Sequence, residues 1–163
     1  MKKAILESIK HALAKLVESD AFLIKAEVNE RSITHQLAVH LADEFKGLHV
    51  DCEYNRMFKN GHNVPKRAVR RSGTQQVSIA DLNARTAYPD IIVHRREDDA
   101  HNLLILEAKK SGADVSEDYE KLNGFMASKN DKGLGYEFSA FVTFNTDDPA
   151  DSSVEVKQQG EKW

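Results

Sequence analysis

Residues 88–110, YPDIIVHRREDDAHNLLILEAKK, contain two runs that are typical of β-strands, separated by the polar stretch 97–101. The first run is short and β-branched. The second run is apolar on both faces, as expected for a central strand that is covered on both sides. We expect the two runs to form an antiparallel hairpin, in which the start of the first strand lies beside the end of the second.

The expected register of this hairpin decides which side chains meet. Pairing Arg96 with Asn102 would place Asp90 opposite Ala108. Pro89 has no N–H to donate, so the ladder of hydrogen bonds would be interrupted just before Asp90. The sequence therefore predicts an opening at this edge of the sheet.

Two carboxylates and an amine would converge at that opening. Glu107 and Lys109 face the same side of their strand, about 7 Å apart, because side chains alternate along a strand. Asp90, Glu107 and the backbone carbonyl of Ala108 are oxygen ligands of the kind that Mg²⁺ or Mn²⁺ prefers. Such a metal would activate water for attack on a phosphodiester, and Lys109 would orient that water or stabilise charge on the phosphate. The alternative is a structural ion pair between Asp90 and Lys109.

A third carboxylate, Glu30, shares the apolar face of a predicted helix with Ile33 and Leu37. An unpaired buried charge is costly, so Glu30 needs a partner. A metal ion, the N-terminal dipole of the helix or a salt bridge would each supply one. Glu30 is therefore a candidate catalytic residue and metal ligand.

The remaining pattern predicts an α/β fold, with a mixed sheet flanked by helices. We expect one domain, 1–163, with its core at about 29–145. The other predicted segments are a helical extension at 1–28 that contains a helix at 3–18, a helix starting near Asn29, strands at 50–54, 76–79 and 139–144, a helix capped by Asp114, and a polar tail at 146–163.

Composition limits the class of protein. The chain has 163 residues, of which 40% are hydrophobic and 30% charged, as is usual for globular proteins. No apolar run approaches the roughly 20 residues needed to span a bilayer, so we expect no membrane association. The single Cys52 excludes an intramolecular disulfide and a multi-cysteine zinc site. We expect a cytoplasmic protein.

The charge is unevenly distributed. Between Arg56 and Arg85 there are seven basic residues and one acid, a formal charge of +6, although the whole chain carries −3. We expect Arg67, Arg70 and Arg71 in this segment to contact phosphates of a nucleic acid. The alternative is a solvated basic loop.

The motif Pro89-Asp90, followed after sixteen residues by Glu107-Ala108-Lys109, resembles that of the PD-(D/E)xK nuclease superfamily. The order of predicted elements across 29–144 is also similar to the helix, three strands, helix and strand of that family's core. The segments DCEYNR, YPDIIVHRR and NLLILEAKK are similar to small uncharacterised members.

The resemblance implies a restriction-endonuclease-like three-layer sandwich. It also implies that Asp90 and Glu107 bind a divalent metal and that Lys109 assists the attacking water. Glu30 fits the place of a glutamate that many members carry before the first strand. Lys121 is the nearest candidate for a lysine or glutamine that some members use in the helix after the motif.

Together these observations predict a Mg²⁺-dependent nuclease that acts on DNA in preference to RNA. The sequence leaves open whether it is an endonuclease or an exonuclease. It also leaves open whether it works as a homodimer or as a subunit of a larger defence or repair complex. The alternative function is a catalytically silent nucleic-acid-binding or protein-interaction module on the same fold.

Overall fold

The computed structural model describes residues 1–54, 56–59, 62–65, 88–127 and 134–163. A mixed five-stranded sheet forms its centre, in the order β1-β4-β5-β6-β7. The elements of the main body are α1 (Lys2–Lys25), α2 (Glu30–Glu44), β1 (His49–Cys52), β4 (Ile91–Arg95), β5 (Asp98–Lys110), α3 (Ser116–Met126), β6 (Phe138–Phe144), a 3₁₀ turn η2 (Pro149–Asp151) and β7 (Ser153–Gln158). A separate antiparallel pair consists of β2 (Arg56–Lys59) and β3 (His62–Pro65).

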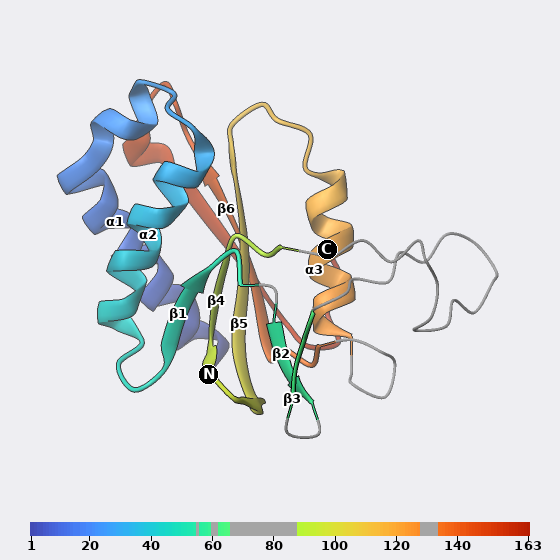
Figure 1. Ribbon diagram of the computed structural model, residues 1–163. Helices are drawn as coiled ribbons and strands as arrows, with labels where there is room; N and C mark the ends of the chain where they lie inside the picture. Colours follow the sequence, from blue (N-terminus) through green and yellow to red (C-terminus); the bar gives the residue numbers. More distant parts are fainter. Residues whose placement is uncertain (55, 60–61, 66–87, 128–133) are drawn as a thin grey trace.

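Helices cover both faces of the sheet. Figure 1 shows α1 and α2 side by side against one face, and α3 against the other. The central strand β5 pairs antiparallel with β4 and parallel with β6. The α/β class and the mixed sheet between helices are therefore as predicted. No helix in the described ranges is long and apolar enough to cross a membrane.

Alternation along β5 assigns its side chains to the two cores. Leu104, Leu106 and Ala108 belong to the core beneath α1 and α2. Ile105 belongs to the smaller core beneath α3. Glu107 lies between Leu106 and Ala108 in sequence, so its side chain is on the α3 face of the sheet.

The helix before the sheet begins where the sequence predicts. Asn29 is the N-cap of α2, and its side chain accepts a hydrogen bond from the backbone N–H of Arg31 at 3.0 Å. Such a cap satisfies a backbone donor that the helix itself leaves unpaired. Glu30 is thereby held in the first turn of α2. The apolar stripe that follows, Ile33 and Leu37, is fully buried.

The predicted hairpin is present, but its register and turn differ from the prediction. β5 begins at Asp98, so the turn is shorter than 97–101, and Arg95 rather than Arg96 is the last paired residue of β4. Asn102 pairs with His94, because a bulge shifts the register on either side of His94. The predicted pairing of Arg96 with Asn102 was therefore wrong.

The shift does not separate the two ends of the hairpin. Ile91 pairs with Leu106, so continuing this ladder brings Asp90 to the level of Glu107. The carboxylate of Asp90 nevertheless accepts a hydrogen bond from the backbone N–H of Ala108 at 2.8 Å. This contact holds the start of β4 against the end of β5.

The C-terminal residues are not the polar tail that the sequence predicts for 146–163. They form η2 and then β7, which pairs antiparallel with β6 at the edge of the sheet. Trp163 stacks on Tyr119 of α3 with ring centroids 5.3 Å apart, and its indole N–H donates to Ser139 at 2.7 Å. The chain end thus covers the smaller core.

Two further predictions concern the ends of the described structure. α1 continues to Lys25, past the predicted 3–18, with a kink at Asp20. Its residues Ile9 and Leu16 are fully buried in the larger core, so the N-terminal helix is packed into the fold. The strand predicted at 76–79 lies outside the described residues.

Candidate functional site

The carboxyl end of β5 is where the predicted site residues meet. Glu107 and Lys109 belong to β5, Asp90 lies just before β4, and Glu30 starts α2. Lys121 comes from α3 and contacts Glu107, with its Nζ 3.5 Å from Glu107 Oε2. The structure therefore brings Glu30, Asp90, Glu107, Lys109 and Lys121 into one cluster of charges.

Glu107 is the most buried member of this cluster, with 1% of its surface exposed. Its Oε1 is buried and has no hydrogen-bond partner among the described residues. Burial is the main reason why the pKa of Glu107 is raised well above its usual range, and the charge of Asp90 adds to the shift. A carboxylate oxygen in this state is available to a cation or a proton.

Asp90 is also perturbed. Burial raises the pKa of Asp90 to about 6, and the charge of Glu30 acts in the same direction. The hydrogen bond from Ala108 opposes the shift without cancelling it. Two neighbouring carboxylates with raised pKa values are typical of sites that bind metal ions or transfer protons.

Lys109 is held by two carboxylates from other elements. Its Nζ lies 3.3 Å from Glu30 Oε1 and 3.6 Å from Asp118 Oδ2. Burial alone would lower the pKa of Lys109, but the charges of Asp118 and Glu30 outweigh it, and the pKa is raised. Among the described residues there is no ion pair between Lys109 and Asp90, so the structural ion pair considered above does not form.

Glu30 has both of its oxygens occupied. Oε1 accepts from Lys109, and Oε2 accepts from the backbone N–H of Lys110 at 3.2 Å. A salt bridge is one of the three ways in which the sequence predicts that the charge of Glu30 is compensated. In this arrangement Glu30 orients Lys109 and fixes α2 against the end of β5.

Asp118 is a member of the cluster that the sequence analysis missed. It lies in the first turn of α3, is 3% exposed and contacts Lys121 Nζ through Oδ1 at 2.8 Å. A signal for it existed, because Asp118 stands three residues after Val115 and four before Leu122, on the inward face of the helix. The same pattern identified Glu30.

The charges of the cluster do not balance. Four carboxylates, those of Glu30, Asp90, Glu107 and Asp118, face two lysines, which leaves two formal negative charges. Among the described residues Asp90 has no ion pair, and Glu107 has one, with Lys121 at 3.5 Å. A single divalent cation would compensate this excess.

The donor set fits a hard cation through two carboxylates and one carbonyl. The Ala108 N–H points to Asp90, and the N–H and C=O of one strand residue point to the same side, so the Ala108 carbonyl faces the same opening. Across the described parts of the chain, no group of three or more His, Cys, Asp or Glu side chains is arranged to hold a metal ion. A site here would thus depend on Asp90, Glu107, the Ala108 carbonyl and water.

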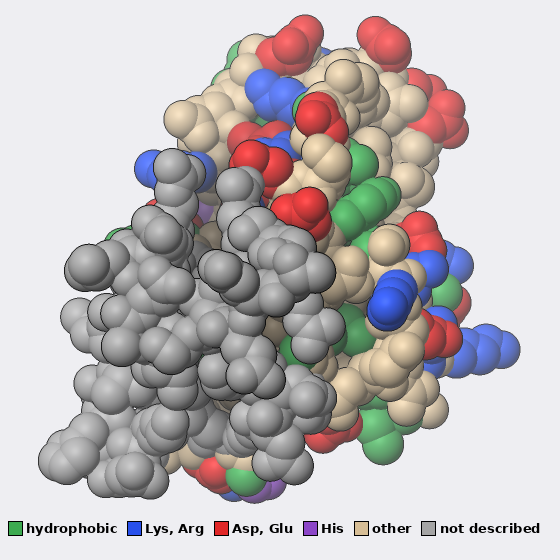
Figure 2. All heavy atoms as spheres, turned by 90° about the vertical axis from the view of Figure 1, so that its right-hand side faces the viewer, with side chains coloured by type: hydrophobic (Ala, Val, Ile, Leu, Met, Phe, Trp, Pro, Cys, Tyr) green, Lys and Arg blue, Asp and Glu red, His purple; other side chains and the backbone are tan. Residues whose placement is uncertain are grey.

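The described surface on the α3 side carries several acidic side chains. Figure 2 shows acidic side chains gathered in the upper half of this face, with lysine or arginine side chains among them. An anionic substrate would be repelled by such a surface without a compensating cation. The predicted phosphate contacts Arg67, Arg70 and Arg71 lie outside the described residues and remain predictions.

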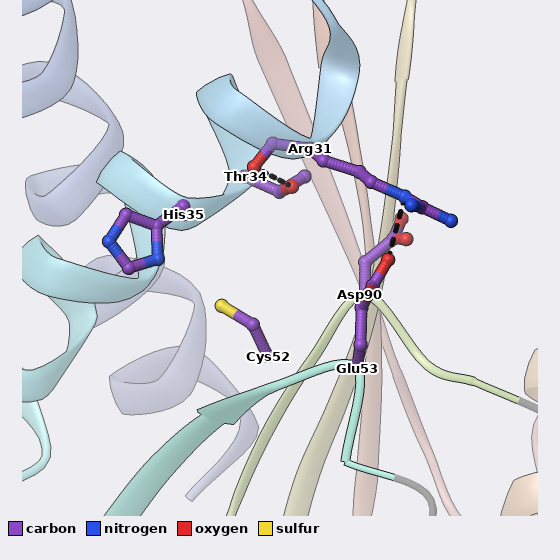
Figure 3. A pocket seen from close by; sticks show the side chains of 6 residues that line it. All are labelled: Arg31, Thr34, His35, Cys52, Glu53 and Asp90. Atoms are coloured by element: carbon purple, nitrogen blue, oxygen red, sulfur yellow. Dashed lines mark hydrogen bonds and ion pairs between the residues drawn. The ribbon is translucent and has the colours of Figure 1, made fainter.

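A pocket opens beside Asp90 on the α2 side, with a volume of about 190 Å³. Figure 3 shows the six side chains that line it: Arg31, Thr34, His35, Cys52, Glu53 and Asp90. Arg31 reaches from α2 to Glu53 and forms an ion pair at 2.8 Å. Burial raises the pKa of the Cys52 thiol to about 11, so it is a neutral part of the wall. The pocket gives Asp90 a route to solvent.

Comparison with known proteins gives no match among protein-family models, curated proteins or solved structures. The class that the fold and the cluster define is an α/β protein with a mixed sheet and a buried acidic site at the end of its central strand. Any assignment to a family rests on the residues of that site.

The raised pKa of Asp90 predicts a pH-dependent stability. The folded protein binds the proton of Asp90 more tightly than the unfolded chain, so its free energy of unfolding falls as pH rises from about 4 to about 6. Asp90→Asn lacks this proton but keeps an oxygen for the Ala108 N–H. In the absence of metal, the free energy of unfolding of Asp90→Asn minus that of the wild type should increase by on the order of 1–3 kcal/mol between pH 4 and pH 7.5.

Urea unfolding of both proteins at the two pH values measures this gain, because the titration of all other groups largely cancels in the difference. Glu120→Gln, which changes an exposed carboxylate on α3, is the control. A wild-type minus Asp90→Asn difference that is the same at both pH values would contradict the prediction.

Proposed function

We propose that this protein is a divalent-metal-dependent nuclease of the PD-(D/E)xK superfamily, and that its α/β sandwich is of the restriction-endonuclease-like type. The proposal rests on one observation above all. Asp90, directly before β4, and Glu107 of β5 lie close together at the end of β5, where Glu107 keeps a buried oxygen without a partner among the described residues. Lys109 follows Glu107 by two residues on β5.

Asp90, Glu107 and the Ala108 carbonyl would hold Mg²⁺ or Mn²⁺. When bound, such an ion supplies a Lewis acid for the phosphoryl oxygen and lowers the pKa of a coordinated water. The carboxylates contribute by giving up their protons to accept the cation. Burial of Glu107 keeps bulk water away from its side chain, which strengthens the electrostatic interactions around it.

The lysines act on the substrate. Lys109, oriented by Glu30, would position the attacking water and stabilise negative charge that develops on the phosphate. Lys121 would contact a phosphate oxygen from the α3 side, since its Nζ already lies next to Glu107. Both ammonium groups stay charged at neutral pH, because nearby carboxylates raise their pKa values against the effect of burial.

The substrate is proposed to be DNA in preference to RNA. We expect its phosphates to be contacted by Arg67, Arg70 and Arg71. The affinity for DNA should therefore fall steeply as the salt concentration rises. The protein would act as a homodimer or as a subunit of a larger defence or repair complex.

A nuclease assay with matched lysine variants tests the proposal. Purified protein with Mg²⁺ or Mn²⁺ should cleave DNA, and Lys109→Met should lower the rate by roughly 100-fold or more because a charge next to the reacting phosphate is lost. Lys110→Met is the control, since the Lys110 side chain points away and its Nζ donates to the Glu27 carbonyl at 2.7 Å. Equal activity of the two variants, or no cleavage of DNA or RNA by the wild type, would count against a nuclease.

Metal binding is tested separately from activity. Saturating Mn²⁺, at about 100 times its dissociation constant, should raise the free energy of unfolding of the wild type by about 2.7 kcal/mol. Glu107→Gln should abolish this stabilisation, because it removes the charged ligand. Glu120→Gln, which changes an exposed acid on α3, should retain it. Absence of any Mn²⁺ effect on the wild type would instead favour the catalytically silent binding module.

A further inference from the structure

We propose that Asp118 is a positioning residue, which holds Lys109 and Lys121 at the site through its two carboxylate oxygens. The inference rests on the proposed function, since it explains how that site keeps its lysines in place. Neither the PD-ExK pattern nor the spacing of the acids along β5 includes Asp118.

The geometry assigns one oxygen of Asp118 to each lysine. Oδ1 lies 2.8 Å from Lys121 Nζ, and Oδ2 lies 3.6 Å from Lys109 Nζ. The two lysines come from different elements, α3 and β5. The carboxylate therefore links the helix to the strand at the point where the substrate would bind.

Asp118 is the buried member of this link, whereas the side chains of Lys109 and Lys121 are 30% and 37% exposed. The Asp118 side chain is 4% exposed, so its charge depends on these two partners and on the N-terminal end of α3, where the helix dipole favours an acid. Removing one partner of a buried ion pair is usually far more costly than breaking an exposed pair. Without Asp118, Lys109 would keep only its contact with Glu30 and Lys121 only its longer contact with Glu107.

Asp118 holds Lys121 more closely than Glu107 does. Lys121 is nearer to Asp118, at 2.8 Å, than to Glu107, at 3.5 Å. A cation that binds Glu107 would weaken the longer contact and leave the shorter one intact. Lys121 would then stay beside the site, free on one side to contact a phosphate, while Asp118 retains it on the other.

Substitution of Asp118 by asparagine tests the role. Asparagine keeps the size of the side chain, but its amide nitrogen would face one of the two ammonium groups as a second donor. Asp118→Asn should lower kcat about 10–100-fold, the range seen when partners that orient active-site groups are removed. KM for DNA should change little, because misplaced lysines affect the transition state more than ground-state binding.

Two matched variants control for charge and for structure. Glu120→Gln removes the same charge from an exposed position on the same helix and should leave kcat unchanged. Asp118→Glu keeps a carboxylate and should restore part of kcat. An Asp118→Asn variant with the kcat of the wild type would overturn the proposal.

A measurement without catalysis separates this proposal from the proposed function. NMR of the lysine ammonium groups should detect slowly exchanging signals of Lys109 and Lys121, assigned with Lys109→Arg and Lys121→Arg. Both signals should be lost in Asp118→Asn and kept in Glu120→Gln. If these signals behave as stated but the protein cleaves no nucleic acid, the nuclease fails and the positioning role stands. Signals that persist in Asp118→Asn would overturn the role even in an active nuclease.

The wild type alone gives a final test that does not depend on how well a variant folds. A scalar coupling across the hydrogen bond, between the ammonium nitrogen of Lys121 and the carboxylate carbon of Asp118, should be measurable. Absence of that coupling, together with fast exchange of the Lys121 ammonium protons, would contradict the proposed contact.

Discussion

Glu107 is a buried carboxylate at the end of the central strand, and the arrangement of the site depends on how its charge is compensated. Alternation along β5 places Leu106 and Ala108 in the core beneath α1 and α2, so Glu107 must face α3. There it is 1% exposed, and the charge of Asp90 adds to the effect of burial in raising its pKa. A charge in such a place is tolerated only with partners. Lys121 supplies one, and the other oxygen has none among the described residues.

The surrounding residues form a framework for this strand end. The hydrogen bond from Ala108 to Asp90 closes the β4–β5 hairpin, while Glu30 binds both Lys109 and the Lys110 backbone from α2. Asp118 performs the corresponding task from α3. Carboxylates from helices on opposite faces of the sheet therefore fix the lysines. The two carboxylates with raised pKa values come from the sheet region, since Glu107 belongs to β5 and Asp90 directly precedes β4. Acids on the helices thus orient Lys109 and Lys121, while Asp90 and Glu107 are the proposed metal ligands.

The parts of this site that could be predicted follow from local patterns. A β-branched run, a polar turn and an apolar run are enough to predict the hairpin, and hence the approach of Asp90 to Glu107. The register could not be predicted, because a bulge at His94 depends on packing that no short pattern records. β7 was missed because a polar edge strand has one solvated face and a weak apolar signal. Asp118 was accessible to the argument used for Glu30 but was not considered.

A purely structural role for the cluster is difficult to reconcile with its energetics. An ion pair across the hairpin would place Lys109 on Asp90, whereas Lys109 binds Glu30 and Asp118. Asp90 and Glu107 are left as neighbouring acids whose pKa values burial raises, and such a pair lowers stability at neutral pH. Replacement of buried ionic groups by apolar side chains of similar size is often neutral or stabilising, so stability alone does not require this arrangement. Sites that sacrifice stability in this way are commonly those in which a ligand restores the balance. A divalent cation held by Asp90 and Glu107, as proposed above, would offset the two formal negative charges, and the two lysines would remain available to an anionic substrate.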